Sequence, residues 1–147
     1  MSIEQLDKVG EVADTNPASA SRIRRDRIAR AVAVLALGVI AAAHVPVAVD
    51  HIGEIPYLGS AFYALVLLCA AALGSLVVES RTAVWRGVLV LALGSIVAYV
   101  VSRTVGLPLA EDDIGDWANP LGAVSVAAEL VVAAVSLSVL HRRRHDR

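Results

Sequence analysis

Four long apolar runs alternate with short polar segments along this chain. The runs cover about residues 30–49, 56–79, 84–105 and 119–140. A predominantly apolar run of this length can cross a bilayer as a helix, and a helix satisfies its own backbone hydrogen bonds in hydrocarbon. The pattern therefore predicts an all-α fold: a bundle of four transmembrane helices that occupies residues 28–141.

Proline and glycine mark several of the expected helix ends. Pro56 and Pro120 lie at the start of the second and fourth runs, where the fixed φ angle of proline favours helix entry. The sequence Gly106-Leu107-Pro108 is typical of a helix end, so the third helix should stop there. The polar flanks, residues 1–27 and 142–147, are expected to be basic cytoplasmic tails, and the first of them to be disordered.

Composition agrees with the membrane class and removes one kind of enzyme. The chain has 147 residues, is 57% hydrophobic and has a mean hydropathy of +0.68. Its single cysteine, Cys69, lies within the second run, which excludes a thiol oxidoreductase with paired cysteines. The alanines at 41–43 follow a basic stretch as in a signal peptide, but the apolar run continues to Val49 and favours a retained helix.

The distribution of charge predicts the orientation. Of the 13 Lys and Arg, six lie within residues 8–30, two at positions 81 and 86, four within residues 142–147, and only Arg103 lies elsewhere. The positive-inside rule then places both termini in the cytoplasm, in a bacterial inner (plasma) membrane. The opposite face is acidic and the net charge is −1, so a nucleic-acid partner is not expected.

The most informative residue is the carboxylate within the fourth run. Glu129 follows Pro120 by nine positions. At ~1.5 Å per residue this places it roughly 13 Å into a hydrocarbon core of ~30 Å. A charge at that depth costs about 2.5 to 3.5 kcal/mol, so such a residue normally faces a partner or a hydrated cavity.

Matching depths predicts a polar cluster around this carboxylate. The third and fourth helices should be antiparallel neighbours because a short loop joins them. The cluster is expected to form an outward-facing pocket for a ligand or proton, from His44, Tyr99, Arg103, Ser125 and Glu129. The alternative is a structural hydrogen-bond network that fixes the register of the helices.

A second group of residues raises the question of a divalent metal. Histidine with carboxylate favours zinc, manganese or copper over calcium, although no metal-binding motif is present. The candidate ligands at the outer face are His44, Asp50, His51, Glu54, Asp112, Asp113 and Asp116. An acidic outer loop is also what the charge asymmetry alone would produce.

Three segments form a recognisable pattern: His44 with Asp50-His51-Ile-Gly-Glu54-Ile-Pro-Tyr-Leu-Gly59-Ser-Ala-Phe62, then Tyr99-Val-Val-Ser-Arg-Thr-Val-Gly-Leu-Pro108, then Asp113-Ile-Gly-Asp-Trp117 with Pro120-Leu-Gly122, Ser125 and Glu129. Together they resemble a family of small, uncharacterised four-helix bacterial integral membrane proteins. The resemblance covers residues 40 to 130 approximately. It implies the four-helix topology and no activity or ligand.

Three function classes remain open. The leading hypothesis is a non-enzymatic protein that binds a small ligand, a proton or a metal ion. The second is a structural or accessory subunit that packs against another membrane protein, or against copies of itself, within the bilayer. The third is a membrane enzyme that uses the histidines and carboxylates with a metal. No residue is assigned a catalytic role.

Overall fold

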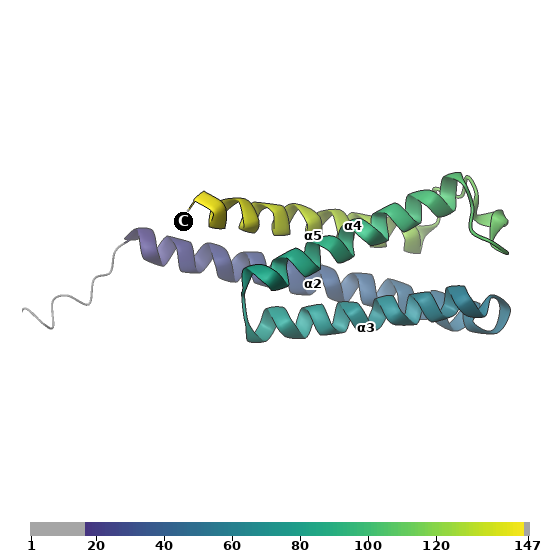
Figure 1. The fold of residues 1–147 in the computed structure, drawn as a ribbon, viewed down its shortest axis with the longest axis horizontal. Coiled ribbons are helices and arrows are strands. Elements are labelled where there is room, and N and C mark those ends of the chain that lie inside the picture. Colours follow the sequence, from purple (N-terminus) through teal and green to yellow (C-terminus); the bar gives the residue numbers. More distant parts are fainter. Residues whose placement is uncertain (1–16, 146–147) are drawn as a thin grey trace, which may run out of the picture.

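The protein is a bundle of long helices, and the computed structural model describes residues 17–145 (Figure 1). The helices are α2 (Pro17–Glu54), α3 (Pro56–Val78), α4 (Thr82–Thr104) and α5 (Pro120–His145), with a short 3₁₀ helix, η1 (Glu111–Asp113), between α4 and α5. Residues 17–145 contain no strand beyond an isolated bridge between Leu107 and Ala110. The predicted all-α, four-helix fold is therefore confirmed.

Two helices are longer than the apolar runs from which they were predicted. α2 starts at Pro17 instead of about residue 30, so residues 17–27 are helical where a disordered tail was expected. Alanine and arginine favour helix there, and Asp26 forms an ion pair of 3.1 Å with Arg143 of α5. α5 likewise continues to His145. The rest of the two predicted tails, residues 1–16 and 146–147, lies outside the described residues.

The surface of the bundle is that of a membrane protein. All four helices are long and apolar enough to cross a bilayer. Large aliphatic side chains point outward on α3 and α4: Leu67 is 70% exposed, Val78 85% and Val90 70%. An apolar surface this extensive is stable in hydrocarbon and unstable in water. The chain is an integral membrane protein.

The helices pack unevenly around the bundle axis. α3 packs along α2, α2 on α5, and α5 on α4, whereas α3 and α4 meet at few points. Gly59 permits the close α2–α3 contact, because a Cβ atom there would lie 2.5 Å from the backbone of Ile52. In Figure 1, α4 leaves the short turn after α3 and runs obliquely away from it towards α5.

The two ends of the bundle differ in packing and in charge. The first residues of α2, the α3–α4 turn and the last residues of α5 lie at one end, called here the basic end (Figure 1). The core near that end is closely packed, with Trp85, Leu37 and Leu76 almost completely buried. The α2–α3 turn and the acidic α4–α5 connection lie at the other end, called the loop end.

The α4–α5 connection folds back onto the end of α4. Gly106 ends the helix with a φ of 84°, a left-handed conformation that suits glycine, as its position in the sequence predicts. Gly115 then donates a backbone hydrogen bond of 2.9 Å to the carbonyl of Arg103. The connection is thereby held over the loop end of the bundle, where it can contribute side chains to a site between the helices.

Candidate ligand-binding site

A cavity of about 770 Å³ lies between the four helices towards the loop end. It lies where α3 and α4 diverge, and all four helices and the α4–α5 connection contribute to its wall. Most of the wall surface is apolar. The structure brings to this one cavity all five residues of the predicted polar cluster: His44, Tyr99, Arg103, Ser125 and Glu129.

Glu129 forms the buried polar centre of the cavity wall. Its side chain is 1% exposed. The hydroxyl of Ser125, one turn earlier on α5, donates to Oε1 at 3.1 Å, and the hydroxyl of Ser95 on α4 donates to the same oxygen. Within the part of the chain that the structure describes, no protein group bonds Oε2, although this oxygen is buried. Half of the carboxylate is thus held by the protein and half is left without a partner.

Ser95 is the member of this centre that the sequence did not identify. It precedes Tyr99 by four residues and Arg103 by eight, so the three residues lie along one face of α4. This i, i+4, i+8 spacing is the signal that could have revealed it. A serine within an apolar helix is otherwise unremarkable, because its hydroxyl can bond a carbonyl of its own helix.

His44 extends the hydrogen-bonded group towards α2. Its Nδ1 lies 2.9 Å from the carbonyl oxygen of Ile40 and 3.4 Å from the hydroxyl of Ser125. A carbonyl only accepts, so Nδ1 carries a proton and donates to it; Nε2 is the acceptor of the tautomer that this bond selects. His51, one turn from the end of α2, repeats this arrangement, with Nδ1 2.9 Å from the carbonyl of Val47. Both imidazoles therefore offer an Nε2 acceptor that no group within residues 17–145 occupies.

An aromatic side chain lies between the two imidazoles. The ring of Phe62 on α3 is 5.4 Å from the ring of His44 and 5.8 Å from that of His51, measured between centroids. All three rings belong to the cavity wall. This side of the cavity therefore combines aromatic faces with nitrogen acceptors.

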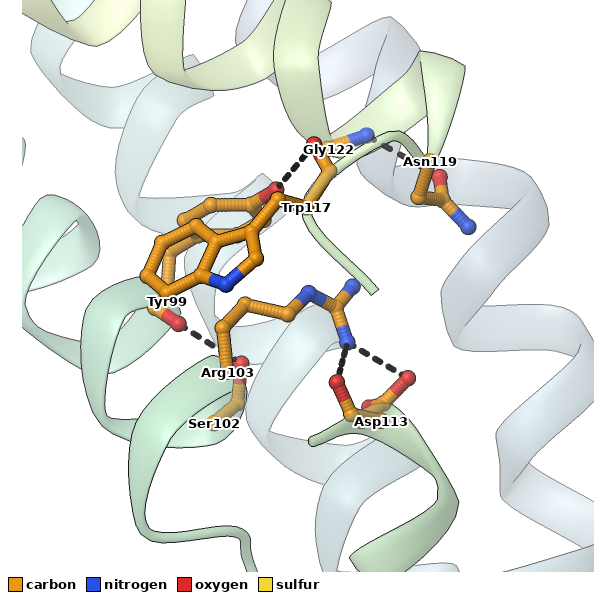
Figure 2. A network of polar contacts seen from close by, with 7 residues as sticks. All are labelled: Tyr99, Ser102, Arg103, Asp113, Trp117, Asn119 and Gly122. Carbon is orange, nitrogen blue, oxygen red and sulfur yellow. Dashed lines mark hydrogen bonds and ion pairs between the residues drawn. The ribbon is translucent and has the colours of Figure 1, made fainter. Parts of the chain in front are cut away.

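Arg103 closes the loop end of the cavity as half of an ion pair (Figure 2). Its side chain is 8% exposed, and Nη1 lies 2.6 Å from Oδ1 of Asp113 and 3.2 Å from the carbonyl oxygen of the same residue. The guanidinium also lies over the ring of Tyr99, 5.0 Å from its centroid. Arg103 shares the cavity with Glu129, but its charge is neutralised by the loop carboxylate.

Tyr99 is positioned by α5 and by the connection. Figure 2 shows its hydroxyl pointing to the carbonyl of Trp117, at 3.5 Å, with the indole ring close by. On the other side the tyrosine ring lies against Gly122, where a Cβ atom would come within 2.7 Å of Cε2. Asn119 accepts a hydrogen bond of 3.2 Å from the Gly122 amide and so caps the start of α5.

The structure does not assemble the candidate metal ligands. No three His, Cys, Asp or Glu side chains among residues 17–145 form a group that could hold a metal ion. Asp113 is engaged with Arg103, and both histidines use Nδ1 on their own helix. Three of the candidates, Glu54, Asp112 and Asp116, are exposed and lie outside the cavity wall. Asp50 and His51 lie in the wall but do not complete a ligand set.

The group formed by Ser125, His44 and Glu129 has the residue types of a hydrolase triad but not its geometry. In a triad, histidine accepts the serine proton and the carboxylate orients the histidine. Here Ser125 donates directly to Glu129, and the histidine nitrogen nearest the serine already carries a proton. The arrangement can hold a polar ligand group, but it does not activate the serine as a nucleophile.

Comparison of the chain with protein-family models, with curated proteins and with solved structures finds no match. The family resemblance drawn from the sequence therefore stays a prediction, and the function has to be argued from the cavity alone.

Proposed function

We propose that this integral membrane protein is a non-enzymatic binding protein for a small, largely apolar organic cation, such as a protonated amine or a quaternary ammonium compound. The observation that carries the proposal is Glu129, which is 1% exposed and whose Oε2 has no partner among the described residues. A buried carboxylate with one free oxygen is costly unless something binds it. A cationic ligand in the cavity would supply the missing partner.

The polar groups of the wall favour a positive ligand over a negative one. The only basic side chain in the described wall that carries a fixed charge is Arg103, and Asp113 neutralises it. Asp50 lies in the wall without an ion pair in residues 17–145. The Nε2 atoms of His44 and His51 are acceptors. Among the free groups of the wall, Oε2 of Glu129 and the carboxylate of Asp50 favour a positive ligand, and Nε of Arg103 is the one buried donor without a partner in the described residues. A quaternary ammonium compound complements the carboxylates by charge, and a protonated amine adds an N–H donor.

Size and apolar character define the rest of the ligand. The volume of about 770 Å³ lies within the range of about 300–1,000 Å³ that is usual for small-molecule sites. Aliphatic side chains such as Leu58, Leu65 and Leu91 make up much of the wall. The aromatic rings near His44 would attract a cation that has lost its water. A bare metal ion would leave most of this volume empty.

The orientation completes the proposal. The basic end carries Arg81 of the α3–α4 turn, Arg86 near the start of α4 and the arginines of the last turn of α5, whereas the loop end carries Asp50, Glu54 and the acidic connection. By the positive-inside rule the basic end lies in the cytoplasm, in a bacterial inner membrane, and the cavity opens towards the outer face. The ligand would then reach the site from outside the cell.

The test compares two probes of the same shape. Benzyltrimethylammonium is a quaternary cation, and neopentylbenzene is its neutral isostere. Both are titrated into the detergent-purified protein by isothermal titration calorimetry. We expect the cation to bind more tightly than the neutral compound. Glu129→Gln should weaken binding of the cation by roughly tenfold or more, because it removes a buried charge partner, and should leave binding of the neutral compound unchanged.

Glu111→Gln is the matched control, because Glu111 is exposed in η1 and lies outside the cavity wall. It removes the same charge without touching the site and should bind both probes like the parent protein. Equal binding of the cation and its neutral isostere, or equal binding of the cation by parent and Glu129→Gln, would refute the proposal.

A further inference from the structure

A second, smaller pocket lies at the basic end of the bundle and shares one lining residue, Val90, with the ligand cavity. It has a volume of about 370 Å³ and lies between the first half of α4 and the last turns of α5. Its lining consists of Thr82, Arg86, Leu89, Val90, Leu140, Arg143 and Arg144. Three arginines and no carboxylate line this pocket, so its field favours an anion.

Polar and apolar groups are separated along the depth of the pocket. On α4, Thr82 and Arg86 come first, and the aliphatic pair 89–90 follows one turn deeper. On α5 the order is reversed, with Leu140 before Arg143 and Arg144. α4 begins at the end of the bundle where α5 finishes (Figure 1). The arginines therefore gather at the surface and the aliphatic side chains lie towards the hydrocarbon.

The arginines are not equivalent. Arg143 is already paired: it donates to the carbonyl and the hydroxyl of Ser80 and forms the ion pair with Asp26. Arg86 and Arg144 are both exposed, and neither has an ion pair in the described residues. The nearby Glu79 is bound to Arg81 at 2.8 Å. Two positive charges at the mouth of the pocket are thus left uncompensated.

The start of α4 adds a third attraction for an anion. Its N-cap residue, Arg81, makes no side-chain capping bond to the amide groups of the first turn. Free amide groups at a helix start bind phosphate oxygens well. The free carbonyl groups at the end of α5 carry a partial negative charge, and this charge by itself explains basic residues in the last turn of that helix. They do not account for Arg86, which lies on α4.

We propose that this pocket binds the phosphate of an anionic phospholipid, with its acyl chains on the aliphatic side chains below. Arg86, Arg144 and the amide groups at the start of α4 bind the phosphate. Leu89, Val90 and Leu140 contact the first methylene groups of the chains. Inorganic phosphate would satisfy the arginines but would leave the aliphatic floor uncovered, so the pocket fits a lipid better than a free anion. The site adjoins the ligand cavity at Val90, but the lipid contacts do not depend on what that cavity binds.

The test measures binding by native mass spectrometry of the full chain released from detergent, with three probes: dioleoylphosphatidylglycerol, dioleoylphosphatidylcholine and inorganic phosphate. The anionic lipid should bind most tightly. The double variant Arg86→Gln/Arg144→Gln should weaken its binding by about 25-fold, on the basis of about fivefold for each basic residue near an anionic lipid. Arg86→Lys/Arg144→Lys should restore part of the loss, because the charge returns without the planar guanidinium.

The matched control is Arg24→Gln/Arg27→Gln, which removes the same charge from exposed positions of α2 at the same end of the bundle. It should bind the anionic lipid like the parent protein. Helix content by circular dichroism verifies that each variant is folded. Three results would overturn the proposal: equal binding of the two lipids, equal losses in the Arg86/Arg144 and Arg24/Arg27 variants, or phosphate binding as tight as that of the anionic lipid.

Discussion

Ser95 of α4 and Glu129 of α5 are hydrogen-bonded to each other across the helix interface, although 34 positions separate them in the sequence. The serine donates to the same carboxylate oxygen that receives the hydroxyl of Ser125. This pair fixes the depth of α4 relative to α5 within the wall of the ligand cavity. Because both serines bond Oε1, the other carboxylate oxygen, Oε2, has no donor among the described residues.

Ser95→Ala is therefore expected to destabilise the bundle. Removing one donor from a buried carboxylate should lower the free energy of unfolding by about 1 to 3 kcal/mol. Ser95→Ala/Ser125→Ala should cost more than the sum of the two single changes, because Oε1 then loses both donors. Unfolding in mixed micelles of increasing denaturing detergent measures the effect.

Ser138→Ala is the control, since Ser138 is exposed and bonds only the carbonyl of Val135 on its own helix. A loss no larger than that of the control would contradict this role for Ser95.

Glu129→Leu separates binding from stability. A buried polar group held for function is often less stable than an apolar side chain of similar volume. We expect Glu129→Leu to keep the fold, with an equal or higher thermal unfolding midpoint in detergent, and to lose cation binding. A variant that was both more stable and still bound benzyltrimethylammonium would show that the polar centre serves only the register of the helices.

Asp113→Asn should leave the guanidinium of Arg103 buried without its counter-charge. Loss of one partner from a buried ion pair costs about 3 to 5 kcal/mol. The cost here should be nearer 2 kcal/mol, because Asp113 is 35% exposed and water can reach the freed group. The free energy of unfolding in detergent measures it, and Asp112→Asn is the control, because Asp112 is exposed and outside the cavity wall. Equal effects at the two positions would mean that the ion pair contributes nothing to folding.

Gly122→Ala should displace the ring of Tyr99, which lines the cavity. The added Cβ atom would lie 2.7 Å from Cε2 of Tyr99, so the ring has to move at a cost of about 1 to 3 kcal/mol in unfolding free energy. Without the tyrosine ring the added Cβ atom meets no obstacle. The double variant Gly122→Ala/Tyr99→Ala should therefore lose less unfolding free energy than the sum of the two single variants. Gly74→Ala, where nothing lies within 4 Å of the added atom, should be neutral or stabilising. Additive effects of the Gly122 and Tyr99 changes would contradict the contact.

The proposed orientation can be checked by labelling in intact cells with a membrane-impermeant maleimide. The native Cys69 is 1% exposed and should not react in the folded protein. Glu111→Cys, in the α4–α5 connection, should react from outside the cell, whereas Ser80→Cys, in the α3–α4 turn, should react only after the cells are opened. The reverse pattern would place the termini outside and the cavity on the cytoplasmic side.

The four helices, the charge difference between the two ends and the depth of Glu129 within its helix all follow from the amino-acid pattern alone. Depth follows from the sequence because a helix advances ~1.5 Å per residue from an end that proline or glycine marks. This is why counting from Pro120 was sufficient to place Glu129 deep in the bundle, and why residues of matching depth on three helices were grouped around one site. The extra length of α2 was not predicted, because an arginine-rich segment has no apolar periodicity.

The side-chain contacts between helices could not be predicted from the sequence and are known from the packed bundle. The direction in which a side chain points depends on how each helix is rotated against its neighbours, and that rotation is set by packing at many positions together. The rotation of the helices places Ser95 against Glu129 and lets Arg103 form its ion pair with Asp113. It does not bring the candidate metal ligands together into one group. The oblique path of α4 away from α3 left the space between them as a cavity, which no pattern along one chain segment records.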